Sequence, residues 1–342
     1  MTNATELKSV PGRGGPCFRF RENPSLRTNA RVALGFYSIH FRGCINSFSG
    51  LHMAWRPVSY DIVHALGFHI EGLDSSFNEA CARIGVVPIS EIDRGYWGKS
   101  LGAIVETANG TRHWLKVFGV TEVDNANRLA EIRADEIVGI WKPLLITQHD
   151  WTDAGIHYTA RLMTLANNSI ERHPWAGMAA VQTPDTWIRD LMTTLNHLGS
   201  YASTGTFLKQ RTLEDWLFAR HHIQCEFPQG EWRLSHNDLH WGNVTAPILS
   251  ILDWEWHGYS PVGYAPGRLI AFACRHDGLV NRLERAFEPY FASFTGLVAR
   301  AYATERVMEG VRSGLFDPEL EFSLGRMIDR LDEELHVRRP RT

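Results

Sequence analysis

One segment in the second half of the chain limits the fold and the chemistry more than any other. It reads His236-Asn-Asp238-Leu-His-Trp-Gly-Asn243, and Asp253 follows at the end of the apolar run 248–252. A loop that carries a carboxylate and ends in an amide, next to a strand that ends in a second carboxylate, can bring three polar side chains to one point. Phosphoryl transfer uses such a set, since a base accepts the hydroxyl proton and oxygen ligands hold Mg²⁺ on the phosphates. The alternative is a chance arrangement of polar loop residues.

This segment resembles the catalytic loop of the protein-kinase-like superfamily, H-x-D-x-x-x-x-N. With Leu252-Asp-Trp-Glu255 and Gly258-Tyr-Ser-Pro261 it is more similar still to the aminoglycoside phosphotransferase family, and the resemblance extends over roughly residues 80 to 310. The resemblance implies that Asp238 is the catalytic base and that His236 supports the catalytic loop. It also implies that Mg²⁺ binds to two residues, Asn243 and Asp253.

The sequence departs from the family pattern after the second metal ligand. The family usually has an aspartate near Ala265, where this chain reads Tyr264-Ala-Pro-Gly-Arg268. That aspartate is regarded as structural, so the departure bears on the local architecture rather than on the chemistry. Two further residues of the motif, His240 and Glu255, receive no definite role from the resemblance.

The order of the periodic segments predicts two lobes. Strand patterns run through the first half, with an Asn109-Gly110 turn between two of them. We expect a helix from about Asn125 to Trp141 and a mainly helical second half, interrupted by short apolar strands near Val244 and at 249–252. Strands followed by helices predict an α+β arrangement, and the resemblance implies a two-lobed, protein-kinase-like fold with a small antiparallel-sheet N-lobe and a mainly helical C-lobe. The expected strands of the first half span 86–92, 101–107, 111–118 and 156–162.

We divide the chain into three parts. Residues 1–54 are an N-terminal extension, either a tail or a small ordered element, because the arginines scattered there follow no helical or strand period. Residues 55–164 are the nucleotide-binding N-lobe. Residues 165–342 are the C-lobe, which carries the catalytic and substrate-binding residues.

Lys116 lies inside the apolar strand Trp114-Leu-Lys-Val-Phe118. An unpaired buried ammonium group is unfavourable, so Lys116 should have a carboxylate and a phosphate as partners, as the strand lysine of kinases does. Glu131 is the preferred carboxylate, because it lies beside the inward stripe of the expected helix, and Glu136 is the alternative. A lysine that extends from the sheet face into solvent is the simpler reading.

Two more segments of the N-lobe are candidates for nucleotide contacts. The turn Gly95-Tyr-Trp-Gly98-Lys-Ser100 resembles a phosphate-covering loop, in which glycines let backbone N–H groups approach phosphates. A plain hairpin turn explains it equally well, and Gly98 and Ser100 are the residues we assign to it. Met163 falls where the interlobe hinge of the family holds the adenine by backbone contacts.

Composition narrows the function classes. The formal charge is -3, from 35 Lys and Arg against 38 Asp and Glu, so no basic excess indicates a nucleic-acid partner. The five cysteines include no C-x-x-C pair, so we expect free thiols rather than a disulfide framework or a cysteine-based zinc site. No apolar run approaches the ~20 residues of a membrane span, and the N-terminus lacks an apolar signal core. We therefore expect a cytoplasmic protein with no nucleic-acid or membrane partner.

The sequence thus predicts a kinase that uses Mg²⁺ and ATP or GTP to phosphorylate a hydroxyl group of a small molecule. By the resemblance, the first candidate for the acceptor is an antibiotic; choline, a sugar or an amino alcohol is the alternative. A peptide acceptor is disfavoured because no A-P-E motif follows Asp253. A nucleotide-binding pseudokinase is the alternative from another class, but its signature would be the loss of Asp238, Asn243 or Asp253. The oligomeric state stays open.

Overall fold

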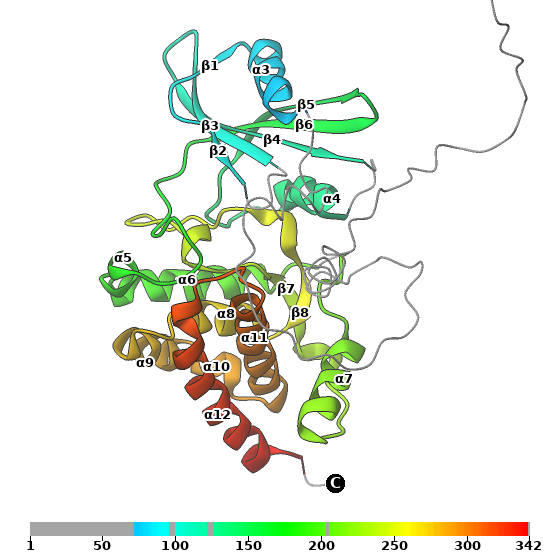
Figure 1. The fold of residues 1–342 in the computed structure, drawn as a ribbon, viewed down its shortest axis with the longest axis vertical. Helices are drawn as coiled ribbons and strands as arrows, with labels where there is room; N and C mark the ends of the chain where they lie inside the picture. The colour runs from blue at the N-terminus through cyan, green and yellow to red at the C-terminus, as the bar shows by residue number, and fades with distance from the viewer. Residues whose placement is uncertain (1–71, 96–99, 122–125, 203–204, 341–342) are drawn as a thin grey trace, which may run out of the picture. The chain divides into compact units, whose positions relative to one another are not determined.

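The computed structural model describes residues 72–95, 100–121, 126–202 and 205–340 (Figure 1). Some of the sequence-based assignments therefore lie outside the described residues. They are the N-terminal extension 1–54, the start of the N-lobe up to residue 71, the expected free thiols of Cys17 and Cys44, and Gly98 of the phosphate-covering turn.

Six antiparallel strands form one sheet in the first half of the described chain (Figure 1). The sheet order is β1-β3-β4-β6-β5, and β2 pairs with β3. Gly110 and the pair Ala154-Gly155 have positive φ, which tight hairpin turns require of their central residues. The strands are β1 (Val86–Pro88), β2 (Asp93–Arg94), β3 (Ser100–Thr107), β4 (Arg112–Val120), β5 (Leu145–Asp153) and β6 (Ile156–Thr164).

The two faces of this sheet differ because side chains alternate along each strand. Helix α3 (Leu73–Ile84) covers one face, where Phe77 and Ala80 of the helix pack against a buried apolar set from the strands. The residues that alternate with this apolar set along the strands, among them Lys116 and Arg161, belong to the opposite face of the sheet. Figure 1 shows α3 and α4 (Ala126–Arg133) on opposite sides of the sheet. The apolar set comprises Leu101, Ala103, Val105, Leu115, Val117, Tyr158, Ala160 and Leu162.

Several elements of this half differ from the sequence-based expectation. Helix α3 and strand β2 were not predicted, and the strand expected over 86–92 ends at Pro88. The helix expected to reach Trp141 ends at Arg133 and continues only as the 3-10 turn Ala134–Glu136, because the backbone of Ile137 is extended, with ψ 107°. Strand β5 was not predicted. It is an edge strand with no buried residue, so its sequence lacks the apolar alternation that signals a strand.

The second half is mainly helical, as the sequence predicts, and its helices enclose a core of their own. α11 runs through that core and is buried over most of its length. The helices are α5 (Met178–Val181), α6 (Asp185–Leu198), α7 (Gln210–His221), α8 (Tyr264–Ala271), α9 (Asp277–Ala286), α10 (Glu288–Phe291), α11 (Phe294–Arg312) and α12 (Glu321–Arg338).

A two-stranded ribbon supports the motif segment. It consists of β7 (Trp232–His236) and β8 (His257–Pro261), which pair antiparallel and were not predicted as strands. The apolar strands expected near Val244 and at 249–252 are instead an isolated bridge between Val244 and Ile251. The segment from His236 to Asn243 thus leaves one strand of the ribbon, and Asp253 comes just before the other.

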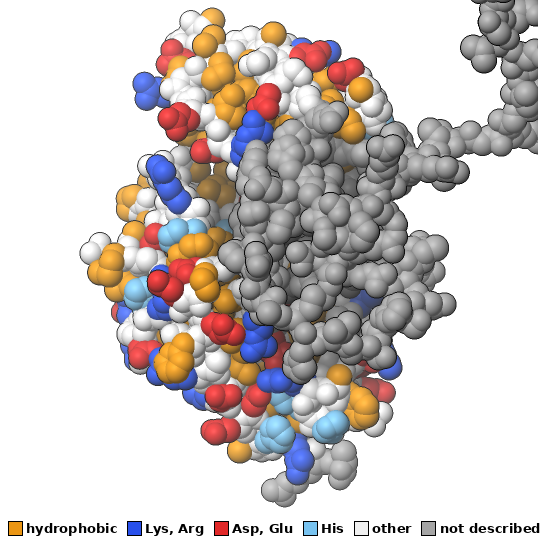
Figure 2. Space-filling view, in the orientation of Figure 1, with side chains coloured by type: hydrophobic (Ala, Val, Ile, Leu, Met, Phe, Trp, Pro, Cys, Tyr) orange, Lys and Arg blue, Asp and Glu red, His pale blue; other side chains and the backbone are white. Residues whose placement is uncertain are grey.

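The fold class is confirmed: a small antiparallel-sheet lobe and a mainly helical lobe, each with its own apolar core, form an α+β protein-kinase-like fold. Cys81, Cys225 and Cys274 are free thiols. Among the described residues, no helix combines the length and the apolar character needed to cross a membrane. On the face in Figure 2, acidic, basic and apolar side chains are interspersed over the described surface.

Candidate active site

The loop after β7 is fixed by its own polar side chains. The amide Nδ2 of Asn237 donates to the carbonyl oxygens of Ser235, Trp256 and Gly258 at 3.1–3.2 Å. The 3-10 turn η4 (Trp241–Asn243) then places the fully buried Trp241 in the core. Asp238 therefore sits on a loop that is anchored on both sides.

His236 connects this loop to the segment of Asp253. Its ring is completely buried, and Nε2 lies 2.9 Å from the carbonyl oxygens of both Leu252 and Asp253. Nε2 must carry the proton, since a carbonyl oxygen only accepts hydrogen bonds. Burial lowers the pKa of His236 to about 4, against the opposing effect of Asp238 and Asp253, so the ring is neutral. This position fits the support role that the sequence predicts for His236.

The carboxylate of Asp238 has a cationic neighbour on one oxygen and polar neighbours on the other. Nη2 of Arg268 donates to Oδ1 at 2.8 Å, and Nδ2 of Asn243 lies 3.3 Å from Oδ2. His240 accepts the N–H of Gly242 on Nδ1, so its Nε2 carries the proton and faces Oδ2 at 3.6 Å. Burial alone would raise the pKa of Asp238, but His240 and Arg268 outweigh it and hold the pKa below the usual range. The carboxylate is therefore ionised.

Asn243 and Asp253 belong to neighbouring chain segments, because the N–H of Leu252 donates to the carbonyl oxygen of Asn243 at 2.8 Å. The side-chain amide of Asn243 donates to Asp238, which leaves its own amide oxygen for a cation. The carboxylate of Asp253 is 39% exposed and so remains accessible.

This donor set fits Mg²⁺, a hard cation that prefers oxygen ligands. The carboxylates there are crowded: burial and the charge of Asp253 raise the pKa of Glu255 to about 7, although Lys116 opposes the shift. A divalent cation would relieve this excess of negative charge. No group of three His, Cys, Asp or Glu side chains arranged for a metal occurs in the described parts of the chain, so an ion held by Asn243 and Asp253 needs phosphate or water oxygens as well.

Lys116 joins the sheet to this site. Its Nζ lies 2.8 Å from Oδ1 of Asp253 and 3.2 Å from Oε2 of Glu131. Burial would lower the pKa of Lys116, but Asp253 and Glu131 raise it above its usual value. The lysine is thus a largely buried, ion-paired cation with a side chain 13% exposed, and the reading as a solvent-extended side chain is wrong. Its helix partner is Glu131, whereas Glu136 is exposed.

The remaining predicted nucleotide contacts lie on the same sheet face as Lys116. Ser100 pairs with Phe118, two residues beyond Lys116 on β4, and its carbonyl oxygen closes the preceding turn by accepting the N–H of Gly95. Met163 is buried on β6, two residues beyond Arg161, which pairs with Lys116. Their contacts with a nucleotide stay a prediction.

Sequence reasoning missed Arg268 as a site residue and gave no role to His240. Arg268 comes from the last turn of α8, in the segment where the family pattern is broken, and its side chain is only 12% exposed. The available signal was an arginine between apolar helix residues, which requires a buried carboxylate partner.

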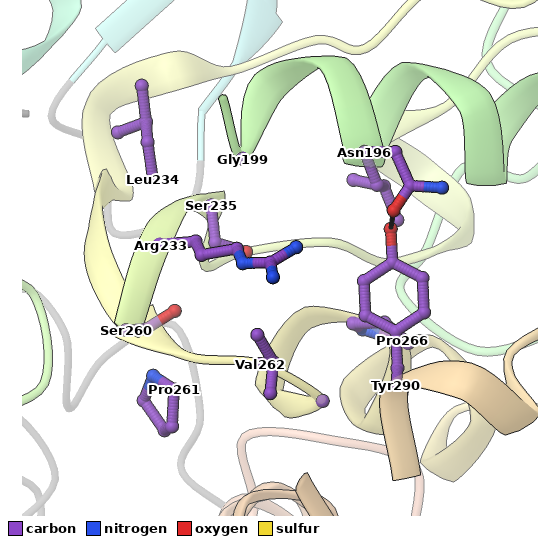
Figure 3. Close-up of a pocket in the computed structure, with 12 residues that line it drawn as sticks. Asn196, Gly199, Arg233, Leu234, Ser235, Ser260, Pro261, Val262, Pro266 and Tyr290 are labelled. Atoms are coloured by element: carbon purple, nitrogen blue, oxygen red, sulfur yellow. Dashed lines mark hydrogen bonds between the residues drawn. The ribbon is translucent and has the colours of Figure 1, made fainter. Parts of the chain in front are cut away.

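A separate pocket lies between the β7–β8 ribbon and helices α6, α8 and α10 (Figure 3). Arg233 extends into it, and the buried Oγ of Ser260 has no hydrogen-bond partner among the described residues. Arg233 and Ser235 alternate with His236 along β7, so the pocket opens on the side of the ribbon away from that ring. None of the predicted site residues lines it.

Comparison with known proteins identifies the fold. No protein-family profile matches the sequence, and no curated protein matches it. Among solved structures, the amicoumacin kinase hAmiN, in complex with AMP-PNP, Ca²⁺ and Ami, is 15% identical with a TM-score of 0.50, over 82% of this chain and 97% of the kinase. The aminoglycoside phosphotransferase APH(4)-Ia is 11% identical with a TM-score of 0.50, over 76% of this chain and 98% of that enzyme. The chain has the fold of the small-molecule kinases.

Proposed function

We propose that this protein transfers the γ-phosphoryl group of a nucleoside triphosphate, ATP or GTP, to a hydroxyl group of a small molecule. The observation that carries the proposal is one connected network across the two lobes. Lys116 contacts Asp253 at 2.8 Å, His236 holds the backbone of Asp253 at 2.9 Å, and Asn243 lies between that segment and Asp238. The network therefore connects β4 to the loop that carries Asp238 and Asn243 and to the segment that carries Asp253.

The chemistry assigns one task to each of these groups. Lys116, oriented by Glu131, binds the phosphates, and Ser100 and Met163 line the nucleotide on the same sheet face. Asn243 and Asp253 would hold Mg²⁺, which neutralises phosphate charge when bound. Catalysis then depends on positioning and electrostatics, with no covalent enzyme intermediate.

Asp238 accepts the hydrogen bond of the acceptor hydroxyl and directs its oxygen toward the phosphorus. Because its pKa is lowered, Asp238 is ionised throughout the ordinary pH range but is a weak base. It therefore orients the hydroxyl first and takes the proton only as the new P–O bond forms.

An antibiotic is the acceptor we propose first, because both solved structures compared above are named as kinases of such molecules. One observation bears on the choice: Arg268 pairs with Asp238, so the charge of this carboxylate is already compensated and attracts a strongly polycationic acceptor less. Neutral or zwitterionic compounds, including sugars and amino alcohols, are therefore the second group to test.

The test is nucleotide consumption with Mg²⁺ across a panel of hydroxylated antibiotics, sugars, choline and amino alcohols, with product phosphorylation measured directly. We expect Asp238→Asn to lower turnover by roughly 10²–10⁴-fold while nucleotide affinity measured by calorimetry is kept, as for the loss of a general base. Nucleotide binding without transfer to any acceptor would support the pseudokinase. Full turnover by Asp238→Asn would remove Asp238 from the mechanism.

A further inference from the structure

Helix α4 presents charged side chains, rather than apolar ones, to the sheet. Arg128, Glu131 and Asp135 are spaced three and four residues apart, which places them on one side of the helix and of the 3-10 turn that continues it. Each contacts the sheet face opposite α3. Their partners there are, in the same order, Thr159, Lys116 and Arg161.

The three partners on the sheet are spaced so that each faces one of the three charged residues of the helix. Lys116 and Arg161 are register partners on β4 and β6, and Thr159 lies two residues before Arg161 on the same face. A shift of the helix by one residue would rotate its side chains by about 100° and separate all three contacts. The polar seam, meaning these six residues, therefore admits one position of α4.

Arg161 makes the tightest contacts in the seam. Its Nη2 lies 2.6 and 2.7 Å from the two oxygens of Asp135, and its Nη1 donates to the backbone carbonyl of Glu131 at 3.1 Å. That carbonyl is in the last turn of α4, where helix carbonyls lack partners along the helix and attract cations. The guanidinium thus holds the backbone of the very residue whose side chain contacts Lys116.

Burial makes this contact difficult to lose. The side chain of Arg161 is 2% exposed and that of Asp135 is 28% exposed. Removing one partner of such a pair leaves an uncompensated buried charge, which is strongly destabilising. At the other end of the seam, Arg128 also pairs with Asp150 at 2.8 Å. The helix is thus held to the sheet at both ends, with Glu131 between them.

We infer that Arg161 and Asp135 are positioning residues for phosphoryl transfer, which keep Glu131 on Lys116 and so fix the lysine for the nucleotide phosphates. The inference rests on the proposed function and extends it to residues that touch neither nucleotide nor acceptor.

The test is a double-mutant cycle in the full-length chain. Asp135→Asn should weaken binding of a Mg²⁺-bound, non-hydrolysable ATP analogue and lower kcat/KM, each by roughly tenfold, the scale typical of residues in one ion-pair network. In a Lys116→Ala background the same change should have no further effect, because Asp135 acts through Lys116. Arg161→Lys, which keeps the charge but loses the planar geometry, should show the same dependence.

The matched control is Glu284→Gln, which disrupts the buried Arg300–Glu284 pair of the helical lobe. It should lower the melting temperature without changing nucleotide affinity. If Asp135→Asn behaves like this control, or costs equally in both backgrounds, Arg161 and Asp135 are structural only and the inference is wrong. If the unaltered chain binds no nucleotide, the proposed function fails instead, and the inference falls with it.

Discussion

His236 makes the free energy of unfolding depend on pH, because its ring is neutral and completely buried. Its pKa of about 4 in the folded chain lies below the ~6.5 of an unfolded histidine. Between these pH values the unfolded chain binds more protons at this histidine than the folded chain does. The contribution of His236 to the free energy of unfolding is therefore complete above pH ~6.5 and is lost as pH falls toward 4. The difference corresponds to a few kcal/mol, about 1.4 per pKa unit.

We predict that the free energy of unfolding of His236→Gln falls less steeply between pH 6.5 and 4 than that of the unaltered chain. Denaturant titrations across this range measure the slope. His149→Gln, which replaces an exposed histidine, is the matched control. Parallel slopes for the unaltered chain and His236→Gln would show that His236 is protonated in the folded state.

The residues around Asp238 show what the sequence contains and what it lacks. Asp238 and Asn243 lie within one loop, so their proximity follows from local spacing. Lys116 was found from one general rule, that a charge in an apolar strand needs partners. The same rule marks Arg268 as a residue that needs a carboxylate partner, but it does not say which one, because the contact with Asp238 depends on how α8 packs in the helical lobe.

At the scale of elements, the turn η4 and the segment before η5 (Trp254–Trp256) should act as one cation site. We predict that Asn243→Ala and Asp253→Ala are strongly non-additive in the Mg²⁺ dependence of nucleotide binding, because losing either ligand already disrupts the shared ion. Calorimetric titration at several Mg²⁺ concentrations gives the coupling energy.

Asn196→Ala provides the comparison for this cycle, since Asn196 contacts Tyr290 in the helical lobe, away from the site. Its effect should add to that of Asp253→Ala. If Asn243→Ala adds to Asp253→Ala as fully as Asn196→Ala does, Asn243 does not bind the cation.

Periodicity predicted several of the elements that bury an apolar face, although it missed helix α3. Strands β3, β4 and β6 fall within a few residues of their expected bounds, since each packs against a core. β5 was missed because it is an edge strand without a buried residue. Helix α4 was predicted but too long, because Ala134 and Ile137 are buried apolar residues that continue beyond the end of the helix at Arg133.

At the scale of the whole molecule, two separate cores are joined by the contact of Lys116 with Asp253. A ligand that contacts both residues should stabilise the folded chain by mass action, about 2.7 kcal/mol at a concentration 100 times its Kd. We predict that a non-hydrolysable ATP analogue with Mg²⁺ raises the melting temperature, and that Lys116→Ala reduces the shift strongly. Differential scanning calorimetry measures both. An equal rise of the melting temperature in Lys116→Ala would show that the nucleotide binds away from Lys116.

Asp253 has φ 58° and ψ 75°, a left-handed conformation that disfavours side chains with a Cβ. The penalty is about 1–2 kcal/mol, a sizeable part of the 5–15 kcal/mol by which domains are stable. Glycine would adopt this backbone more easily, yet it supplies no carboxylate. The aspartate at position 253 is therefore kept against the preference of the backbone. Selection of variants for heat resistance must screen turnover in parallel, because glycine at this position would relieve the backbone while removing the carboxylate that the cation site requires.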